Sequence, residues 1–345
     1  MSETMRAIHL VRRPEGAASL ADFELRTEPV PDPGPDQFLV RIIWLSLDPY
    51  MRGRMNAGRS YVPPVELGAV MPGEAVGEVI ASQHPRFPEG SVVSGMFGWT
   101  SHALSDGTMV RRLDPEVAPL RTALGVLGMP GLTAWASLVE IARGEPGETI
   151  VVSAATGAVG GVLGQLARQR GLHAIGVAGG AEKCAYAVEE LGYAACLDHR
   201  AAPDARALSA EISAAAPDGV QVYHDNVGGK TLAAVLPNMV DHGRIVVCGA
   251  IAWYEGAPAE GDNSAPALWR AILTRRLRAE GMIVIDHFGR FPDFLAEVAP
   301  LVRDGTLRYR ESIAEGLEAA PDAFLGLLKG ANFGKQLVRV GPGPD

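Results

Sequence analysis

The sequence predicts an α/β fold that combines a doubly wound parallel sheet domain with a smaller β-barrel domain. From Thr149 onwards, apolar segments of strand length alternate with segments of helical periodicity, which is typical of a parallel sheet. Before about residue 120, short apolar segments are separated by turns rich in proline and glycine, which is typical of a small barrel or sandwich. The length of 345 residues also favours two domains.

The first element of the parallel sheet lies in an uncharged run from Thr149 to Ala167. The run is long enough to cross a bilayer, but its β-branched first half and its glycines make a poor spanning helix. We interpret it as a buried strand (TIVVSA), a turn (ATGAVG) and a helix that closes at Gly171. No membrane association is therefore expected.

The turn has the form A-x-x-G-x-x-G, with Ala154, Gly157 and Gly160. Glycines at such a turn let the backbone approach a pyrophosphate, which then lies at the positive N-terminus of the helix. A tight turn without a ligand is the alternative. The β-α-β context, completed by a second strand from His173, favours a dinucleotide site.

The end of the second strand indicates which dinucleotide binds. Sites for NAD usually have an acidic residue there, which accepts hydrogen bonds from the ribose hydroxyls. Here Gly179 and Gly180 occupy that place and Lys183 follows, so the segment suits a 2′-phosphate. We predict NADPH rather than NADH, with a solvated Lys183 as the alternative.

Further strands are expected in three segments: Gly219 to Gly229, Gly243 to Tyr254, and Met282 to Ile285. Ligands of doubly wound sheets bind beyond the carboxyl ends of the strands. Asn226, Cys248 to Tyr254 and Met282 to Val284 fall at such ends, although each also has a purely structural interpretation.

Composition and charge exclude some classes of function. The net charge of −9 disfavours nucleic acid as a partner, because phosphate neutralisation needs a basic surface. The start of the chain shows no secretory signal. The three cysteines are scattered and odd in number, so neither a disulfide framework nor a cysteine-rich metal site is indicated. We expect a cytoplasmic protein.

Several motifs, spread over nearly the whole chain, resemble those of one family. They are LSLDPYMRGRM, LGMPGLTAW, AATGAVGGVLGQLAR, EKCAY, DNVGG, GRIVVCGAI and LKGANFGK. Together they are similar to the zinc-independent medium-chain dehydrogenase/reductases, specifically the NADPH-dependent alkenal and enone double-bond reductases of the prostaglandin reductase-like branch.

The resemblance implies a domain organisation. Residues 1–125 would form a GroES-like domain that is completed by residues 309–345. Residues 126–308 would form a Rossmann domain that binds NADPH. Relatives are often dimers joined through the Rossmann sheet, so the resemblance also implies a homodimer.

Metal use is a separate question. Zinc alcohol dehydrogenases of this superfamily place a Gly-His-Glu motif in the barrel domain, where this chain has Pro72, Gly73 and Glu74. No cysteine precedes Cys184. A catalytic zinc needs three protein ligands, so we predict a metal-free site.

The resemblance also implies site residues. Without zinc, a hydrogen-bond donor must stabilise the enolate that hydride addition creates. Tyr254 resembles the tyrosine beside the nicotinamide, which is proposed to hold the enolate or assist protonation. Tyr50 resembles one that contacts the substrate carbonyl. The implied cofactor residues are Gly157, Ala158, Val159 and Gly160 for the diphosphate, Lys183 and His199 for the 2′-phosphate, Asn226 for the ribose, Cys248, Gly249, Ala250, Ile251, Tyr254, Met282, Ile283 and Val284 for the nicotinamide half, and Asn332 from the tail.

One position departs from the family pattern. Many members have a tyrosine where this chain has His199, which is followed by Arg200. Either side chain can donate to a phosphate, and a histidine would make NADPH affinity depend on pH.

Three functions remain open at this point. The leading one is reduction of the carbon–carbon double bond of an α,β-unsaturated ketone or aldehyde, a small-molecule substrate. A zinc-free NADPH quinone oxidoreductase would use the same cofactor residues. A non-catalytic NADPH-binding protein is the alternative from another class.

Overall fold

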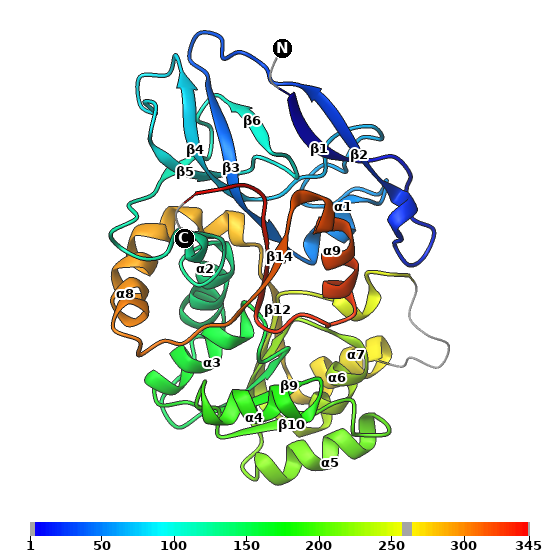
Figure 1. Cartoon of the computed structure of the whole chain (residues 1–345). Coiled ribbons are helices and arrows are strands. Elements are labelled where there is room, and N and C mark those ends of the chain that lie inside the picture. Colours follow the sequence, from blue (N-terminus) through cyan, green and yellow to red (C-terminus); the bar gives the residue numbers. More distant parts are fainter. Residues whose placement is uncertain (1–3, 257–263, 344–345) are drawn as a thin grey trace. The chain divides into compact units, whose positions relative to one another are not determined.

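The computed structural model describes residues 4–256 and 264–343. The chain divides into two compact units. The first unit comprises Met1–Gly128 and Glu311–Asp345, and the second comprises Met129–Arg310. In Figure 1 the first unit is therefore drawn in blue and cyan together with red, the colours of the two ends of the chain.

The second unit is built on a parallel sheet. Within the described residues its strand order is β10-β9-β8-β11-β12-β13, with every pair parallel. This order is that of a Rossmann domain, and the chain reverses direction across the sheet between β8 and β11. The strands are β8 Thr149–Ser153, β9 His173–Ala178, β10 Ala195–Asp198, β11 Val220–Asp225, β12 Met239–Val247 and β13 Arg278–Gly281.

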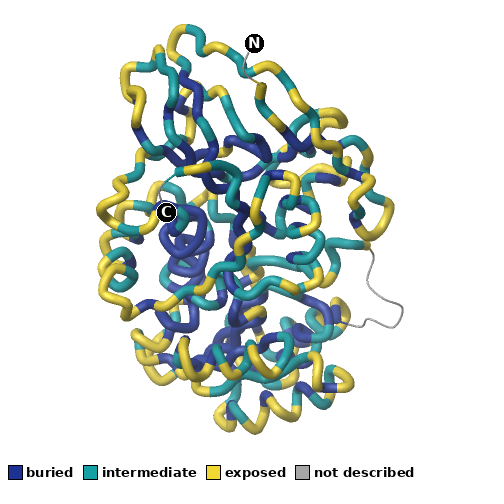
Figure 2. The backbone as a smooth tube through the Cα atoms, in the orientation of Figure 1, coloured by how far each residue is buried: buried dark blue, intermediate teal, exposed yellow. Residues whose placement is uncertain are grey.

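Helices connect the strands of this sheet. All five residues of β8 are buried, because helices cover the sheet and leave no polar face. Figure 2 shows this burial as dark blue along the strands and along α2. The helices are α2 Met129–Ala136, η3 Ser137–Ala142, α3 Gly160–Gln169, α4 Ala181–Glu189, α5 Ala205–Ala215, α6 Gly229–Val235, η4 Leu236–Asn238, η5 Ile251–Trp253, α7 Ser264–Arg275, η6 Val284–Arg290 and α8 Phe291–Arg303.

Two predicted strands are wrong in their limits. The strand expected over residues 243–254 begins earlier and ends at Val247, because the N–H groups of Cys248 and Gly249 turn to the carbonyl of Asp225. The strand expected at residues 282–285 lies instead at Arg278–Gly281. This edge strand is exposed along its length, so no apolar pattern marks it.

The described part of the first unit contains two sheets, whose strand pairs are antiparallel except for the parallel pair β14–β15. Strands β1 and β2 pair with each other, and the larger sheet has the order β14-β15-β3-β4-β5-β7, with β6 paired to β3. Its long central strand β3 is almost entirely buried. The strands are β1 Thr4–Leu10, β2 Phe23–Pro29, β3 Phe38–Leu47, β4 Ala75–Ser82, β5 Val92–Gly95, β6 His102–Ser105, β7 Arg111–Arg112, β14 Glu311–Glu315 and β15 Lys335–Arg339.

The C-terminal segment completes this first unit. Strand β15 lies between β14 and β3, and it pairs antiparallel with β3 from Gln336↔Leu47 to Arg339↔Trp44. Phe324 of α9 and Trp99 pack edge to face in the core, with ring centroids 5.5 Å apart. The helices of the unit are η1 Leu20–Asp22, α1 Tyr50–Arg54, η2 Leu120–Leu124, η7 Leu317–Ala319 and α9 Ala320–Leu328.

In the described part of the chain, none of the helices is both long and apolar enough to cross a bilayer. The uncharged run that begins at Thr149 instead forms β8, a turn and α3.

Candidate functional site

A tight loop joins β8 to α3 in the second unit. The N–H of Gly157 donates to the carbonyl of Ala154 at 2.9 Å, and Ala154 itself has a positive φ of 51°. A Cβ on Gly160 would lie 2.4 Å from that same carbonyl oxygen, so the backbone here tolerates no side chain. The local fold of the loop therefore requires glycine where the motif has it.

This loop suits a pyrophosphate. The first N–H groups of a helix have no partner within the helix, and they carry partial positive charge. Because α3 begins at Gly160 and the Gly157 N–H donates to Ala154, the N–H groups of residues 158–160 gather at the helix N-terminus, with no side chain at Gly160. The residues present thus fit the diphosphate of a dinucleotide.

Asp225 connects this loop to the end of β11, the next strand of the sheet. It is buried, and its Oδ1 accepts hydrogen bonds from Tyr223 Oη at 2.8 Å and Ser153 Oγ at 3.2 Å. The same oxygen accepts the N–H groups of Val227 and Gly228 at 2.9 and 2.8 Å. Burial raises the pKa of this carboxyl, while the N–H donors lower it. Asp225 thereby shapes the turn at the point where the sheet reverses direction.

Asn226 lies beside Asp225, as expected at the strand end. Its Nδ2 donates to the carbonyl of Ser153 at 2.7 Å and lies 3.2 Å from Nδ1 of His224. Burial lowers the pKa of His224 to about 3, so this histidine is neutral at pH 7 and Nδ1 accepts the bond. The amide nitrogen of Asn226 is committed, which leaves the amide oxygen for a ribose hydroxyl.

A group of cationic side chains surrounds the ends of β9 and β10. A Cβ built on Gly179 would lie 2.9 Å from both Arg200 Nε and His199 Nε2. Burial lowers the pKa of Lys183, and Arg200 lowers it further. Burial also lowers the pKa of His199, assisted by Arg200 and opposed by Asp198. Mutual repulsion of this kind is relieved by an anion, so the group fits a 2′-phosphate.

Asp198 and Lys230 hold these cationic groups in place. Asp198 Oδ1 accepts the N–H groups of Gly180 at 2.8 Å and Arg200 at 2.9 Å. Lys230 Nζ donates to the carbonyl of His199 at 2.9 Å. Neither residue is among the predicted site residues, and Asp225 is not among them either. Asp198 and Asp225 each end a strand, which is the signal that could have identified them.

The expected nicotinamide segments follow β12 and β13. The N–H groups of Cys248 and Gly249 donate to the Asp225 carbonyl at 2.8 and 3.0 Å, and Ala252 N–H donates to Val227 O at 3.0 Å. Met282 N–H donates to Val247 O at 2.9 Å, so residues 282–284 lie beside the end of β12. Burial raises the pKa of the Cys248 thiol to about 12, so it remains neutral.

Tyr254 closes the segment after β12. Its hydroxyl oxygen accepts a hydrogen bond from Ala250 N–H at 3.3 Å. Burial raises the pKa of Tyr254, so the hydroxyl keeps its proton at neutral pH. A phenol that accepts a bond from the backbone and keeps its proton is a competent donor.

Tyr50 and Asn332 belong to the first unit. Tyr50 is the first residue of α1, and its pKa is raised well above 10.0 by burial and by the carboxylates of Asp48 and Glu74. Asn332 Nδ2 donates to the carbonyl of Gly334 at 2.7 Å, so the amide stabilises its own turn.

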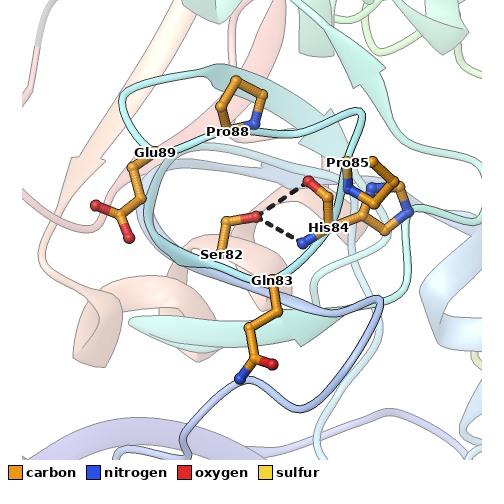
Figure 3. Close-up of a pocket in the computed structure, with 6 residues that line it drawn as sticks. All are labelled: Ser82, Gln83, His84, Pro85, Pro88 and Glu89. Carbon is orange, nitrogen blue, oxygen red and sulfur yellow. Dashed lines mark hydrogen bonds between the residues drawn. The ribbon is translucent and has the colours of Figure 1, made fainter.

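A surface hollow of about 510 Å³ lies elsewhere, at the far end of β4. In Figure 3 its side chains surround Ser82, whose Oγ accepts from His84 N–H at 3.0 Å and lies 3.4 Å from His84 O. None of the predicted site residues lines it. Across residues 4–256 and 264–343, no three histidine, cysteine or acidic side chains are grouped to hold a metal ion.

Comparisons with known proteins show which families and relatives the chain is similar to. Residues 6–113 match the family described as "N-terminal domain of oxidoreductase", and residues 158–299 match "Zinc-binding dehydrogenase". The chain is 43% identical over 333 residues to the NADPH-dependent curcumin reductase of Escherichia coli (strain K12), covering 96% of this chain and 95% of that protein. It is 39% identical over 309 residues to the 2-alkenal reductase (NADP(+)-dependent) of Nicotiana tabacum, covering 89% and 88%.

The chain is also similar to a solved structure. The crystal structure of CurA in complex with NADPH from Vibrio vulnificus matches with a TM-score of 0.92 and 40% sequence identity. The match covers 98% of this chain and 100% of that one.

Proposed function

The chain belongs to the zinc-independent medium-chain dehydrogenase/reductases, in their NADPH-dependent enone and alkenal reductase branch, and from this membership we propose how it works. It reduces the carbon–carbon double bond of α,β-unsaturated ketones and aldehydes with NADPH. In our proposal it does so without a metal, and tyrosine hydroxyls stabilise the developing charge.

The arrangement at the carboxyl edge of the parallel sheet carries this proposal. The glycine loop at Gly157–Gly160 follows β8, the cationic group around Gly179 follows β9 and β10, and the segment that ends in the protonated hydroxyl of Tyr254 follows β12. Phosphate binding and a hydrogen-bond donor are the two requirements of a metal-free hydride transfer.

We assign the cofactor contacts residue by residue. The loop at residues 157–160 binds the diphosphate through the N–H groups of residues 158–160, while Lys183, His199 and Arg200 bind the 2′-phosphate. The amide oxygen of Asn226 binds a ribose hydroxyl. The segments 248–254 and 282–284 line the nicotinamide half, and Asn332 is proposed to contribute from the tail.

The tyrosines carry the chemistry that the protein itself must supply. When bound, NADPH would supply a hydride to the β-carbon of the substrate, and the carbonyl oxygen would then develop negative charge. Tyr50 donates a hydrogen bond to that oxygen, and Tyr254 holds the enolate or delivers a proton to the α-carbon. Both hydroxyls keep their protons at neutral pH, as these roles need.

A substrate panel tests the function and separates the alternatives. Purified protein is mixed with NADPH, or separately NADH, and with short alkenals, an aryl enone or a quinone, and loss of the reduced nicotinamide is followed. We expect fast oxidation of NADPH with the alkenals and the enone. A preference for the quinone would move the protein to the quinone oxidoreductases. Tight NADPH binding without oxidation by any acceptor would indicate a binding protein.

We further propose a cytoplasmic homodimer. The three cysteines are free thiols, as is usual in a reducing compartment. Strand β13 ends the sheet order and is exposed, so a second copy can pair at that edge. Sedimentation equilibrium should give twice the chain mass, and a monomer would refute this assembly.

A further inference from the structure

One glycine in the interior of α3 has no part in the function proposed above. Glycine is unfavourable inside a helix, because it loses more conformational freedom on folding than any other residue. A Cβ on Gly164 would lie 2.1 Å from Cζ and 2.3 Å from Oη of Tyr193. Gly164 therefore leaves room for a phenol that reaches the backbone of this helix.

Tyr193 lies in the segment between α4 and β10, where hydrogen bonds fix its backbone. Its N–H donates to the carbonyl of Ala187 at 3.0 Å, and the N–H of Ala194 donates to the carbonyl of Ala174 in β9 at 2.9 Å. The residue is only 2% exposed. Burial raises the pKa of the phenol well above its usual value, so the hydroxyl keeps its proton. Tyr193 is thus a rigid hydrogen-bond donor.

The hydroxyl of Tyr193 acts on the first turn of α3. Its Oη donates to the carbonyl of Gly160 at 2.7 Å. The same peptide group carries the N–H of Gly161, which donates to the carbonyl of Gly157 at 2.8 Å. The peptide group between Gly160 and Gly161 is therefore held at both ends.

The second of these bonds orients the glycine loop. The carbonyl of Gly157 and the N–H of Ala158 belong to one planar peptide group. The described residues contain no cis peptide bond, so the C=O and N–H of this group point in opposite directions. Because the Gly157 carbonyl points along the helix to Gly161, the Ala158 N–H points out of the helix N-terminus. That is the side on which the diphosphate is proposed to bind.

We propose that Tyr193 is a positioning residue for the cofactor diphosphate: its hydroxyl holds two peptide groups of the loop, so that the N–H groups of residues 158–160 are oriented before the cofactor binds. A loop that is already ordered loses less conformational entropy on binding, so the tyrosine raises the affinity by acting through the loop. This inference rests on the proposed function, because the loop must bind the diphosphate.

Removing the hydroxyl alone tests this role. Tyr193→Phe keeps the buried ring, and we expect the Kd for NADPH to rise about fivefold, the usual net effect of one lost hydrogen bond. The Kd for NADH should rise by the same factor, because both dinucleotides carry the diphosphate. Adenosine 2′-monophosphate has the 2′-phosphate but no diphosphate, so its Kd should stay the same. Calorimetric titration measures all three.

A second tyrosine provides the matched control. Tyr186 lies in α4, and the guanidinium of Arg310 lies 5.7 Å from the centre of its ring. Tyr186→Phe also removes one phenolic hydroxyl, and it should leave the Kd for all three ligands unchanged. In steady-state kinetics with an enone, Tyr193→Phe should raise the KM for NADPH more than it lowers kcat.

Hydrogen exchange gives a readout in the protein without cofactor. If the loop is ordered in advance, the Gly161 amide of the wild type should exchange as slowly as amides in the middle of α3. In Tyr193→Phe it should exchange about fivefold faster. Fast exchange of this amide in the wild type would overturn the proposal even if the variant does not fold.

The outcomes separate this inference from the proposed function. An unchanged Kd for NADPH in Tyr193→Phe, or an equal loss of affinity for adenosine 2′-monophosphate, would overturn the positioning role while enone reduction stands. A wild-type protein that binds NADPH but reduces no enone would overturn the proposed function instead.

Discussion

At the scale of single residues, a backbone N–H group in the second unit orients the hydroxyl of Tyr254. The Ala250 N–H occupies a lone pair of the Tyr254 oxygen at 3.3 Å, so the hydroxyl proton is directed to another acceptor. Burial raises the pKa of this phenol, which keeps the proton in place across the neutral range. The residue is thus suited to stabilise an enolate by hydrogen bonding.

Replacing this hydroxyl tests its role. Tyr254→Phe should lower kcat for enone reduction by about 10²-fold, as the loss of one oxyanion donor typically does. The Kd for NADPH should change little, because the ring remains. Stopped-flow kinetics and fluorescence titration measure the two quantities. Wild-type kcat in the variant would assign enolate stabilisation to Tyr50 or to water.

His199 provides a second test at this scale. Burial and neighbouring cations lower its pKa in the free protein, whereas a bound 2′-phosphate would raise it. Binding then takes up a proton, so affinity for NADP⁺ should rise as the pH falls through the pKa of the bound state. Calorimetric titration between pH 6 and 8 measures this slope. His199→Asn should reduce it, and NAD⁺, which lacks the phosphate, should show none of it. Equal slopes in the wild type and the variant would exclude the histidine.

At the scale of elements, the turn between β8 and α3 depends on one close approach. Two adjacent glycines there differ sharply in their surroundings. A Cβ on Gly160 would meet the Ala154 carbonyl oxygen at 2.4 Å, whereas a Cβ on Gly161 would meet its nearest atom, in Leu191, at 3.5 Å. The helix start therefore needs glycine at the first position only.

This difference supplies a matched pair of variants. Gly160→Ala should destabilise the protein by about 1–3 kcal/mol and weaken NADPH binding, because the loop must move to relieve the overlap. Gly161→Ala should cost less than this, and alanine in a helix can even stabilise it. Chemical denaturation and NADPH titration give both quantities. Equal effects of the two substitutions would contradict the close approach.

At the scale of the whole molecule, the first unit is assembled from both ends of the chain. Strand β15 lies between β14 and β3, and Lys335 at its start is buried against Asp48. The sheet of this unit is therefore complete only when the C-terminal segment has joined the N-terminal one.

Removing one partner of that pair should show how strongly it is needed. Lys335→Met leaves Asp48 buried without its cation, which should lower the free energy of unfolding by about 3–5 kcal/mol. Lys329→Met, at an exposed position after α9, should cost less than Lys335→Met. Urea denaturation compares the two. The expected loss of stability arises because Asp48 is left buried without its cation. Lys335→Met combined with Asp48→Leu should therefore recover much of the free energy of unfolding. No recovery would contradict the pairing.

Local patterns in the sequence determined much of this protein. Alternating apolar strands and periodic helices are signals within short windows, and they indicated the α/β class with a parallel sheet. The loop at Gly157–Gly160 and the glycines before Lys183 were recognisable for the same reason, since one turn and one strand end suffice. The position of strand β13 was predicted wrongly because an exposed edge strand has no apolar face that would mark it in the sequence.

Only the tertiary structure decided which distant side chains meet. Asp225 accepts hydrogen bonds from Ser153 and from its own turn because β8 and β11 are neighbours in the sheet, although 72 positions separate Ser153 from Asp225. Asp48 and Lys335 meet because β15 pairs with β3 in the sheet. Strand order is set by packing of the whole chain rather than by any short segment. Contacts between such distant residues are therefore not visible as a periodic pattern in the sequence.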